Sequence, residues 1–220
     1  MYLEACPSPL EDVATLILET GVRPGEAVNL RWADVYLNPA VHARLGYIAI
    51  REGKSPNAKR NLSLTARAAE MLQTRKASER NDWVFPGGVE DAPILGTYLD
   101  RLHDHVREDL KLPKDFVLHS LWHTMLSRLG EAGADAFTIM KIAGHSSVTV
   151  SQRYVHPTPE GMERAFERLE TLNATKFQEA RTQAAAVGGE AAGLPAKVPT
   201  YKKLRSQGLL QVIEFKNTGP

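Results

Sequence analysis

Apolar residues recur at helical spacing along most of this chain, and the pattern predicts a mainly helical protein. A capping box from Ser8 to Glu11, with proline at the first helical position, is expected to begin the first long helix, and Gly21 to end it. Pro24 then starts a short helix. The same spacing predicts further helices over residues 66–78, 94–110, 118–131 and 135–143, and one that begins at residue 158.

Two short segments, residues 46–52 and 61–65, alternate apolar and polar positions as half-buried strands do. The turn-rich, basic segment 53–60 joins them, so we expect an antiparallel hairpin. The predicted fold class is therefore mainly α with a small antiparallel β-sheet (α+β). Residues 184–199, rich in Ala, Gly and Pro, predict a flexible linker before a basic tail. The apolar run 209–215 within that tail is either an added strand or a partly ordered terminus.

Composition narrows the class of protein. The 220 residues are 43% hydrophobic and 24% charged, which fits a core-forming chain and excludes a fibrous or low-complexity one. With 27 basic and 26 acidic residues the net charge is only +1, so nucleic-acid binding must rest on local charge. Residues 44–60 carry such a local positive charge, with five basic residues against one acidic residue. No run approaches the ~20 apolar residues of a membrane span, no signal peptide is evident, and the lone Cys6 excludes an internal disulfide.

Several basic or imidazole side chains stand at predicted element boundaries, where they are suited to phosphate. Arg23 follows a helix stop, Lys54 lies in the hairpin, His119 begins a helix, and His145 precedes Tyr154. Arginine grips two phosphate oxygens, lysine and histidine transfer protons, and tyrosine supplies a nucleophilic hydroxyl. Taken singly, each has an ordinary alternative: a solvated arginine, a turn lysine or a half-buried aromatic ring. Together they predict phosphoryl transfer without a metal.

Metal binding is the weaker interpretation of the histidines. His119 and His123 are four residues apart and share a helix face, but Ser120 stands where the zinc-peptidase pattern requires glutamate. His103 and His105 are two apart on a predicted helix and so point to different faces.

Four motifs occur in a characteristic order. Residues 19–32 read ETGVRPGEAVNLRW, residues 53–64 hold Gly-Lys before KRNLSL, residues 119–124 read HSLWHT, and residues 142–147 read IAGHSS, with Tyr154 nine residues after the histidine of the last motif. In this order and spacing they resemble the boxes of the tyrosine recombinases, the phage integrase family, over about residues 2–175. The resemblance implies a catalytic domain over residues 1–175. Residues 176–220 then form the end of a C-terminal helix, the linker and the tail.

The resemblance also implies roles for individual residues. Tyr154 attacks the scissile phosphate and leaves a 3′-phosphotyrosine link and a free 5′-hydroxyl, so DNA is cleaved and rejoined for recombination or integration. Arg23 clamps the non-bridging oxygens as charge develops, and Glu26 orients its guanidinium.

Further roles concern protons and DNA contacts. Lys54 protonates the leaving 5′-oxygen, His119 assists proton transfer at the tyrosine, and His145 donates a hydrogen bond to the phosphate. No metal and no cofactor are implied. The expected DNA contacts are Arg44, Arg51, Lys59, Arg60 and Arg153.

One position departs from the family pattern. Trp122 stands where the second phosphate-clamping arginine is expected. An indole offers one neutral N–H where a guanidinium offers five donors and a fixed charge, so the DNA cleavage rate is expected to fall by ~10³ to 10⁵. The alternatives are a catalytically silent DNA-binding or recombination-regulating module on the same fold, and a helical protein-interaction domain.

The resemblance implies partners as well. The expected partner is double-stranded DNA with a specific recombination site, bound by a tetramer of this chain, with a monomer or swapped dimer in the absence of DNA. The helix over residues 158–171 either passes to a neighbouring subunit or packs on its own domain. An N-terminal core-binding domain is expected to be absent, which predicts weak, salt-dependent DNA affinity. The expected location is cytoplasmic and nucleoid-associated, in a bacterial or phage-encoded protein, with no membrane association.

Overall fold

A computed structural model describes residues 1–52, 58–78 and 81–186 of the chain, with side chains as far as residue 182. The chain divides into two units, Met1–His156 and Pro157–Pro220, and each is described by itself. The expected boundary at residue 175 falls within the helix of the second unit and stays a prediction. Lys54 lies outside the described residues, as do the basic tail and most of the predicted linker.

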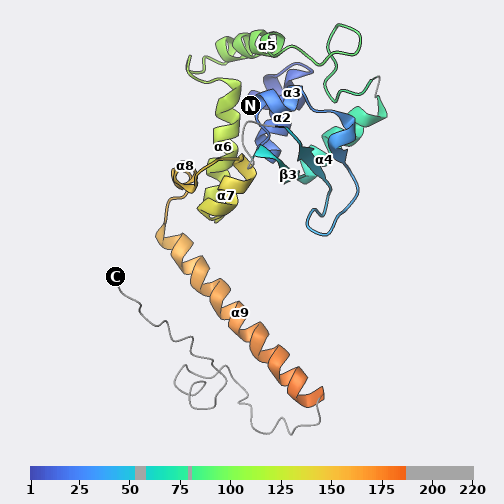
Figure 1. The fold of residues 1–220 in the computed structure, drawn as a ribbon. Helices are drawn as coiled ribbons and strands as arrows, with labels where there is room; N and C mark the ends of the chain where they lie inside the picture. Colours follow the sequence, from blue (N-terminus) through green and yellow to red (C-terminus); the bar gives the residue numbers. More distant parts are fainter. Residues whose placement is uncertain (53–57, 79–80, 187–220) are drawn as a thin grey trace, which may run out of the picture. The chain divides into compact units, whose positions relative to one another are not determined.

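The first unit is mainly helical with one small sheet, so the predicted fold class is confirmed (Figure 1). Its helices are α1 (Tyr2–Ala5), α2 (Leu10–Thr20), α3 (Pro24–Val28), the 3₁₀ turn η1 (Trp32–Asp34), α4 (Ala66–Ala77), α5 (Gly96–Asp109), α6 (Leu118–Glu131), α7 (Ala136–Ala143) and α8 (Val148–Gln152). Its strands are β1 (Val35–Tyr36), β2 (Tyr47–Ile50) and β3 (Arg60–Ser63).

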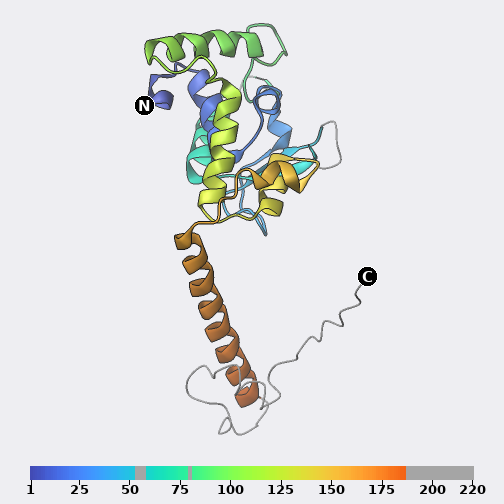
Figure 2. The same ribbon diagram turned by 90° about the vertical axis from the view of Figure 1, so that its left-hand side faces the viewer.

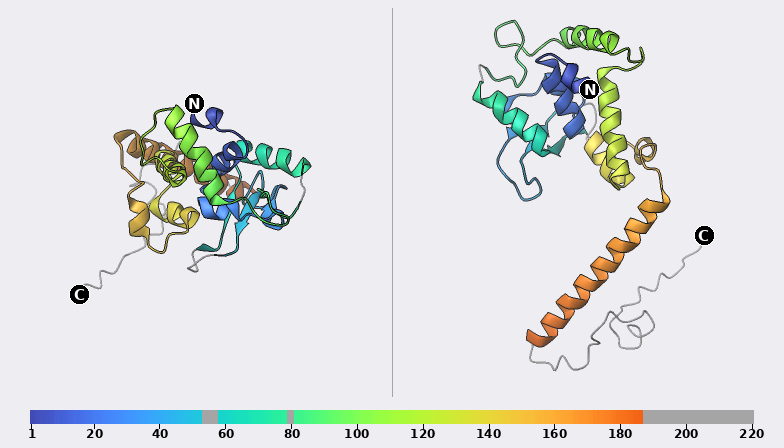
Figure 3. Two further views of the ribbon diagram at one scale, coloured as in Figure 1. Left: turned by 90° about the horizontal axis from the view of Figure 1, so that it is seen from above. Right: turned by 180° about the vertical axis from the view of Figure 1, so that it is seen from behind.

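Helix α2 forms the centre of the core. Leu10, Val13, Leu16 and Ile17 are fully buried, and the helix lies between α6 and α4, with contacts to both (Figures 1 and 3). Gly21 ends α2 in the left-handed conformation, as predicted. The beginning differs from the prediction, because Pro9 is the N-cap residue and no side chain caps the helix.

The three strands pair antiparallel in the order β1-β2-β3. Ile48 of β2 pairs with Leu62 of β3, and both side chains are buried. The predicted hairpin is therefore present, with shorter strands than expected. Strand β1 was not predicted, since its two residues are too few to show an alternating pattern.

Helix α6 spans Leu118–Glu131, the range that the apolar spacing predicted. Helix α5 lies crosswise at its amino-terminal end, and α7 and α8 lie toward its carboxyl end (Figures 1 and 2). At that carboxyl end, Gly130 faces the backbone carbonyl of Tyr154 so closely that a Cβ atom on the glycine would lie 1.8 Å from the carbonyl oxygen. Glycine therefore permits the segment after α8 to lie directly on α6.

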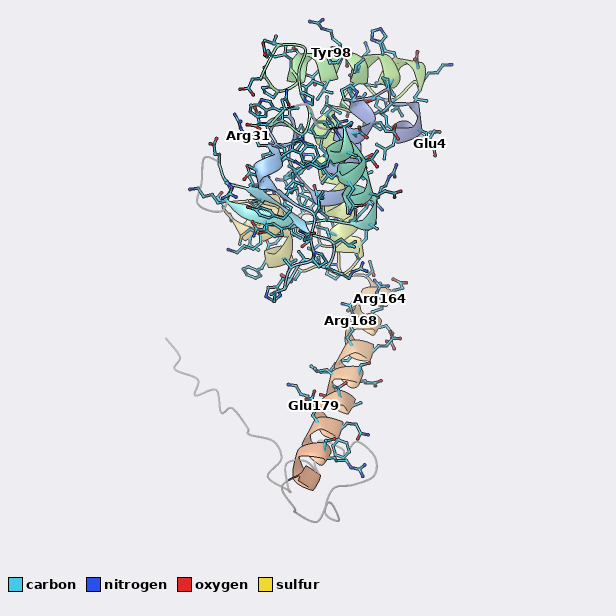
Figure 4. All side chains as sticks on the ribbon, turned by 90° about the vertical axis from the view of Figure 1, so that its right-hand side faces the viewer. Glu4, Arg31, Tyr98, Arg164, Arg168 and Glu179 are labelled. Atoms are coloured by element: carbon cyan, nitrogen blue, oxygen red, sulfur yellow. The ribbon has the colours of Figure 1, made fainter. Side chains whose placement is uncertain are left out.

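The described part of the second unit is one 28-residue helix, α9 (Pro159–Ala186). Arg164, Arg168 and Glu179 project from it (Figure 4), while Met162 and Phe166 are exposed apolar residues. The helix was predicted to begin near residue 158, and its passage to a neighbouring subunit stays a prediction. Among the described residues no helix is long and apolar enough to cross a membrane.

We predict that Gly130→Ala destabilises the first unit by about 1–3 kcal/mol, because the added methyl group overpacks the contact with the Tyr154 backbone. Gly96→Ala is the matched control, since a Cβ atom at Gly96 meets nothing within 4 Å. Urea unfolding of both variants measures the difference. Equal midpoints for the two variants would contradict the close approach.

Candidate active site

Arg23 connects α3 with the carboxyl end of α7. It is the N-cap residue of α3, and its backbone N–H donates to Glu26 Oε2 at 2.9 Å. Its guanidinium Nη2 donates to the carbonyls of Ala143, at 2.7 Å, and Gly144, at 3.2 Å. The side chain stays 33% exposed, so a cationic guanidinium is held at the surface in one orientation. Burial lowers the pKa of Arg23, and the nearby Glu26 carboxylate opposes this effect.

A bidentate ion pair lies behind Arg23. The guanidinium of Arg60 donates to both carboxylate oxygens of Glu26 at 2.9 Å, and its Nε donates to the Ile142 carbonyl at 2.6 Å. Only 6% of the Arg60 side chain is exposed. The expectation that Arg60 contacts DNA is therefore corrected, because its guanidinium is buried and its donors are engaged within the protein. Glu26 does lie beside Arg23, as expected, but its bidentate partner is Arg60.

Trp122 lies beneath the Arg23 side chain. The residue is 3% exposed, and the centroid of its ring is 5.5 Å from Arg23 Cζ. The indole Nε1 donates to the carbonyl of Gly21 at 2.9 Å, which satisfies a carbonyl at the end of α2. His119 stacks on the indole at 4.8 Å between ring centroids, and His145 meets it edge-on at 5.4 Å. Arg23, His119 and His145 thus all pack against the ring of Trp122.

Tyr154 is buried against α6 and the α7–α8 segment. Its hydroxyl is 2.6 Å from Nδ1 of His123, and its ring stacks on that of His145 with centroids 6.3 Å apart. His145 Nδ1 is in turn 2.8 Å from the hydroxyl of Ser151 in α8. The candidate nucleophile is therefore held by side chains from both sides of the cluster.

Burial governs the protonation of this cluster. It lowers the pKa of His119, His123 and His145, and the nearby positive charge of Arg153 adds to the effect at His123 and His145. It raises the pKa of the Tyr154 hydroxyl. Because the ordinary histidine pKa is about 6.5, the imidazoles are mainly neutral at pH 7 and the phenol keeps its proton.

The structure brings most of the predicted site residues together. Arg23, His119, Trp122, His145 and Tyr154 form one connected cluster through the contacts above.

The expected DNA contacts are placed differently. Arg44, Lys59 and Arg153 are exposed, and the exposed Arg51 pairs with Asp34 and donates to the Tyr36 hydroxyl. Lys54 lies outside the described residues.

Two features of the site were not predicted from the sequence. The sequence suggested His123 only as a metal ligand, whereas in the structure His123 forms a hydrogen bond with the Tyr154 hydroxyl. Its four-residue spacing from His119 was the available signal, since it places both on one helix face. The structural role of Arg60 had no local signal, because Glu26 lies 34 residues away. Within the described ranges, no group of three or more His, Cys, Asp or Glu residues is arranged to hold a metal ion.

Comparisons with known proteins agree on one family. The model of the Phage integrase family matches residues 4–160. The integrase of Salmonella phage P22 is 24% identical over 183 residues, which cover 79% of this chain and 46% of that protein. A putative integrase/recombinase of Sinorhizobium fredii, y4qK, is 30% identical over 148 residues, covering 65% of this chain and 44% of that protein. The chain thus spans about half the length of these relatives.

Solved structures share the fold. XerA recombinase superposes with a TM-score of 0.58 at 23% identity, over 76% of this chain and 59% of that one. The Tn1549 transposon integrase in complex with circular intermediate DNA gives 0.59 at 19% identity, over 76% and 64%. The catalytic domain of bacteriophage HP1 integrase gives 0.52 at 21% identity, over 76% of this chain and 88% of that one.

We predict that Arg60→Met destabilises the protein by about 3 kcal/mol, because it leaves the partly buried Glu26 carboxylate without its bidentate partner. Arg101→Met, at an exposed position of α5, is the matched control and should leave the unfolding midpoint almost unchanged. Urea unfolding measures both. If Arg60→Met instead weakened DNA binding at unchanged stability, the structural role assigned to Arg60 would be wrong.

Proposed function

The chain belongs to the phage integrase family of tyrosine recombinases, and from this membership we propose that it cleaves and rejoins DNA at a specific site through a 3′-phosphotyrosine intermediate. In this proposal residues 1–175 act as the recombinase catalytic domain. The reaction conserves the energy of the phosphodiester bond in the tyrosine ester, so rejoining requires no nucleotide cofactor.

The observation that carries the proposal is one cluster built from three separate segments. Arg23 comes from the start of α3, His119 from the start of α6, and His145 and Tyr154 flank α8. A cation, neutral imidazoles and a phenol beside one another are the groups that a metal-independent phosphoryl transfer uses.

Each group has a role consistent with its surroundings. Arg23, fixed by the Ala143 and Gly144 carbonyls, is proposed to clamp the non-bridging oxygens of the scissile phosphate. Tyr154 is the nucleophile and His145 the hydrogen-bond donor to the phosphate. His119 assists proton transfer and Lys54 protonates the leaving 5′-oxygen, as the family resemblance implies.

Trp122 supports the proposal that cleavage by this chain is slow. Its indole N–H is directed at the Gly21 carbonyl, and the ring carries no charge that could replace the second arginine. A phosphoryl transition state that lacks one arginine is stabilised less, by a factor of ~10³ to 10⁵ in rate.

The second candidate function is a catalytically silent DNA-binding or recombination-regulating module. The placement of Trp122 favours this function, because the residue is buried and its indole N–H is hydrogen-bonded to the Gly21 carbonyl. Retention of Arg23, His145 and Tyr154 in one cluster favours the enzyme.

Double-stranded DNA is the proposed partner. The exposed Arg44, Lys59 and Arg153 side chains are proposed to contact its phosphates, and the related Tn1549 integrase was solved with DNA bound. Assembly as a tetramer on DNA, exchange of α9 between subunits and association with the nucleoid stay predictions.

We predict that Trp122→Arg increases covalent adduct formation on a nicked suicide duplex by about 10³-fold or more, because it restores a charged bidentate donor to the phosphate. Tyr154→Phe should abolish the adduct. Denaturing gels measure the rates for the wild-type chain and both variants, below the melting temperature of each.

Gel-shift binding to the same duplex at low salt serves as the control for folding and docking. Equal adduct rates for the wild type and Trp122→Arg would show that Trp122 does not limit the reaction. Binding with no adduct in either would identify the silent module, and no binding at low salt would favour a protein-interaction domain.

A further inference from the structure

Helix α6 holds Tyr154 at two points on one face. Gly130 admits the tyrosine backbone, and His123, seven residues earlier, lies with Nδ1 2.6 Å from the tyrosine hydroxyl. Residues seven apart lie two turns apart on the same side of a helix. The backbone and the reactive oxygen of the proposed nucleophile are therefore both positioned by α6.

Both groups in this hydrogen bond are neutral, and the tautomer of His123 sets which of them donates. Burial raises the pKa of Tyr154, so the hydroxyl keeps its proton, and burial lowers the pKa of His123, so its ring is neutral near pH 7. In the tautomer whose ring proton resides on Nε2, the tyrosine O–H donates to an unprotonated Nδ1. In that tautomer a proton acceptor already contacts the oxygen that must lose its proton, 2.6 Å away.

Several charged or titratable groups face His123. Arg153, next to the nucleophile, lowers the pKa of His123 by its positive charge. On α6 itself, His119 meets His123 edge-on with ring centroids 4.8 Å apart, and it also stacks on Trp122. The charge of His123 in turn lowers the pKa of His145, after the larger effects of burial and of the arginines. Among the described residues, His123 is the hydrogen-bond partner of the Tyr154 hydroxyl.

We propose that His123 is the catalytic base that accepts the proton of Tyr154 in this chain. As Tyr154 Oη bonds to phosphorus and the bond from phosphorus to the 5′-oxygen breaks, the Oη proton moves to His123 Nδ1. A separate acid, Lys54 in the proposed function, protonates the leaving 5′-oxygen. Rejoining reverses both transfers, and His119, which meets the His123 ring edge-on, keeps its assisting role in them. This assignment rests on the proposed function.

The first test needs no DNA. Nitrogen-15 spectra of the histidines, followed over pH in the wild type and in Tyr154→Phe, report which ring nitrogen of His123 is protonated. We expect an unprotonated Nδ1 in the wild type and a rise in the His123 pKa of roughly half a unit in Tyr154→Phe, because a hydrogen bond that favours the neutral ring is lost. A protonated Nδ1 in the wild type, or an unchanged titration, would overturn the assignment.

The second test separates proton acceptance from positioning. His123→Asn keeps an acceptor near the position of Nδ1 but cannot take a proton. We expect it to slow adduct formation by ~10² to 10⁴ in both the wild-type and Trp122→Arg backgrounds, and to remove the rise in rate with pH as His123 loses its proton. His105→Asn, on the exposed part of α5, is the matched control and should leave the rate unchanged.

A duplex with sulfur in place of the bridging 5′-oxygen identifies the step, because a thiolate leaves without protonation. The His123→Asn defect should persist on this duplex. If sulfur restored the rate of His123→Asn, His123 would be the group that protonates the leaving oxygen rather than the base. If His123→Asn formed the adduct on the ordinary duplex at a rate within threefold of its parent, His123 would be rejected as the base. If neither parent forms an adduct on either duplex, the proposed function fails, and the nitrogen-15 spectra still decide the hydrogen bond separately.

Discussion

Three consecutive backbone carbonyls at the carboxyl end of α7 are satisfied by two arginines from distant parts of the chain. Arg60 of β3 donates to the Ile142 carbonyl, and Arg23 at the start of α3 donates to those of Ala143 and Gly144. The last carbonyls of a helix lack partners within the helix and carry partial negative charge, so cations are stabilised there. These bonds dock the α7–α8 segment, with His145 and Tyr154, against the sheet and α3, and the remaining site geometry depends on them.

Trp122 is held in this site by ring packing and by one hydrogen bond. A second arginine beside Arg23 would bring two like charges together, whereas the indole packs under the guanidinium and donates to the Gly21 carbonyl. The indole also contacts His119 and His145, so it fixes their rings by packing. The site thus lacks one positive charge that the family pattern implies, while Arg23, His119, His145 and Tyr154 still form one cluster. Stability and transition-state charge are separate requirements, and this residue meets the first.

Much of the fold could be predicted from local patterns. The residues of α6 and the stop of α2 at Gly21 followed from apolar spacing and glycine, because both are encoded within a few neighbouring residues. The strand β1 and the helices α1 and α8 were missed. They span two to five residues, too few for an apolar pattern, and unlike α3 they have no proline at the first position to mark their start. The charge of Arg60 suggested DNA, and only its burial beside Glu26 revealed a structural partner.

The sequence by itself determined the family, the order of its motifs and the substitution at Trp122, because residue identity and spacing are properties of the chain alone. The tertiary structure decided which side chain contacts which. It paired Arg60 with Glu26, turned the indole N–H to Gly21, and placed His123 rather than another histidine on the Tyr154 hydroxyl. Such choices depend on packing between residues far apart in the chain, as with His123 and Tyr154 at a separation of 31 and Trp122 and Gly21 at 101. No local pattern encodes those contacts.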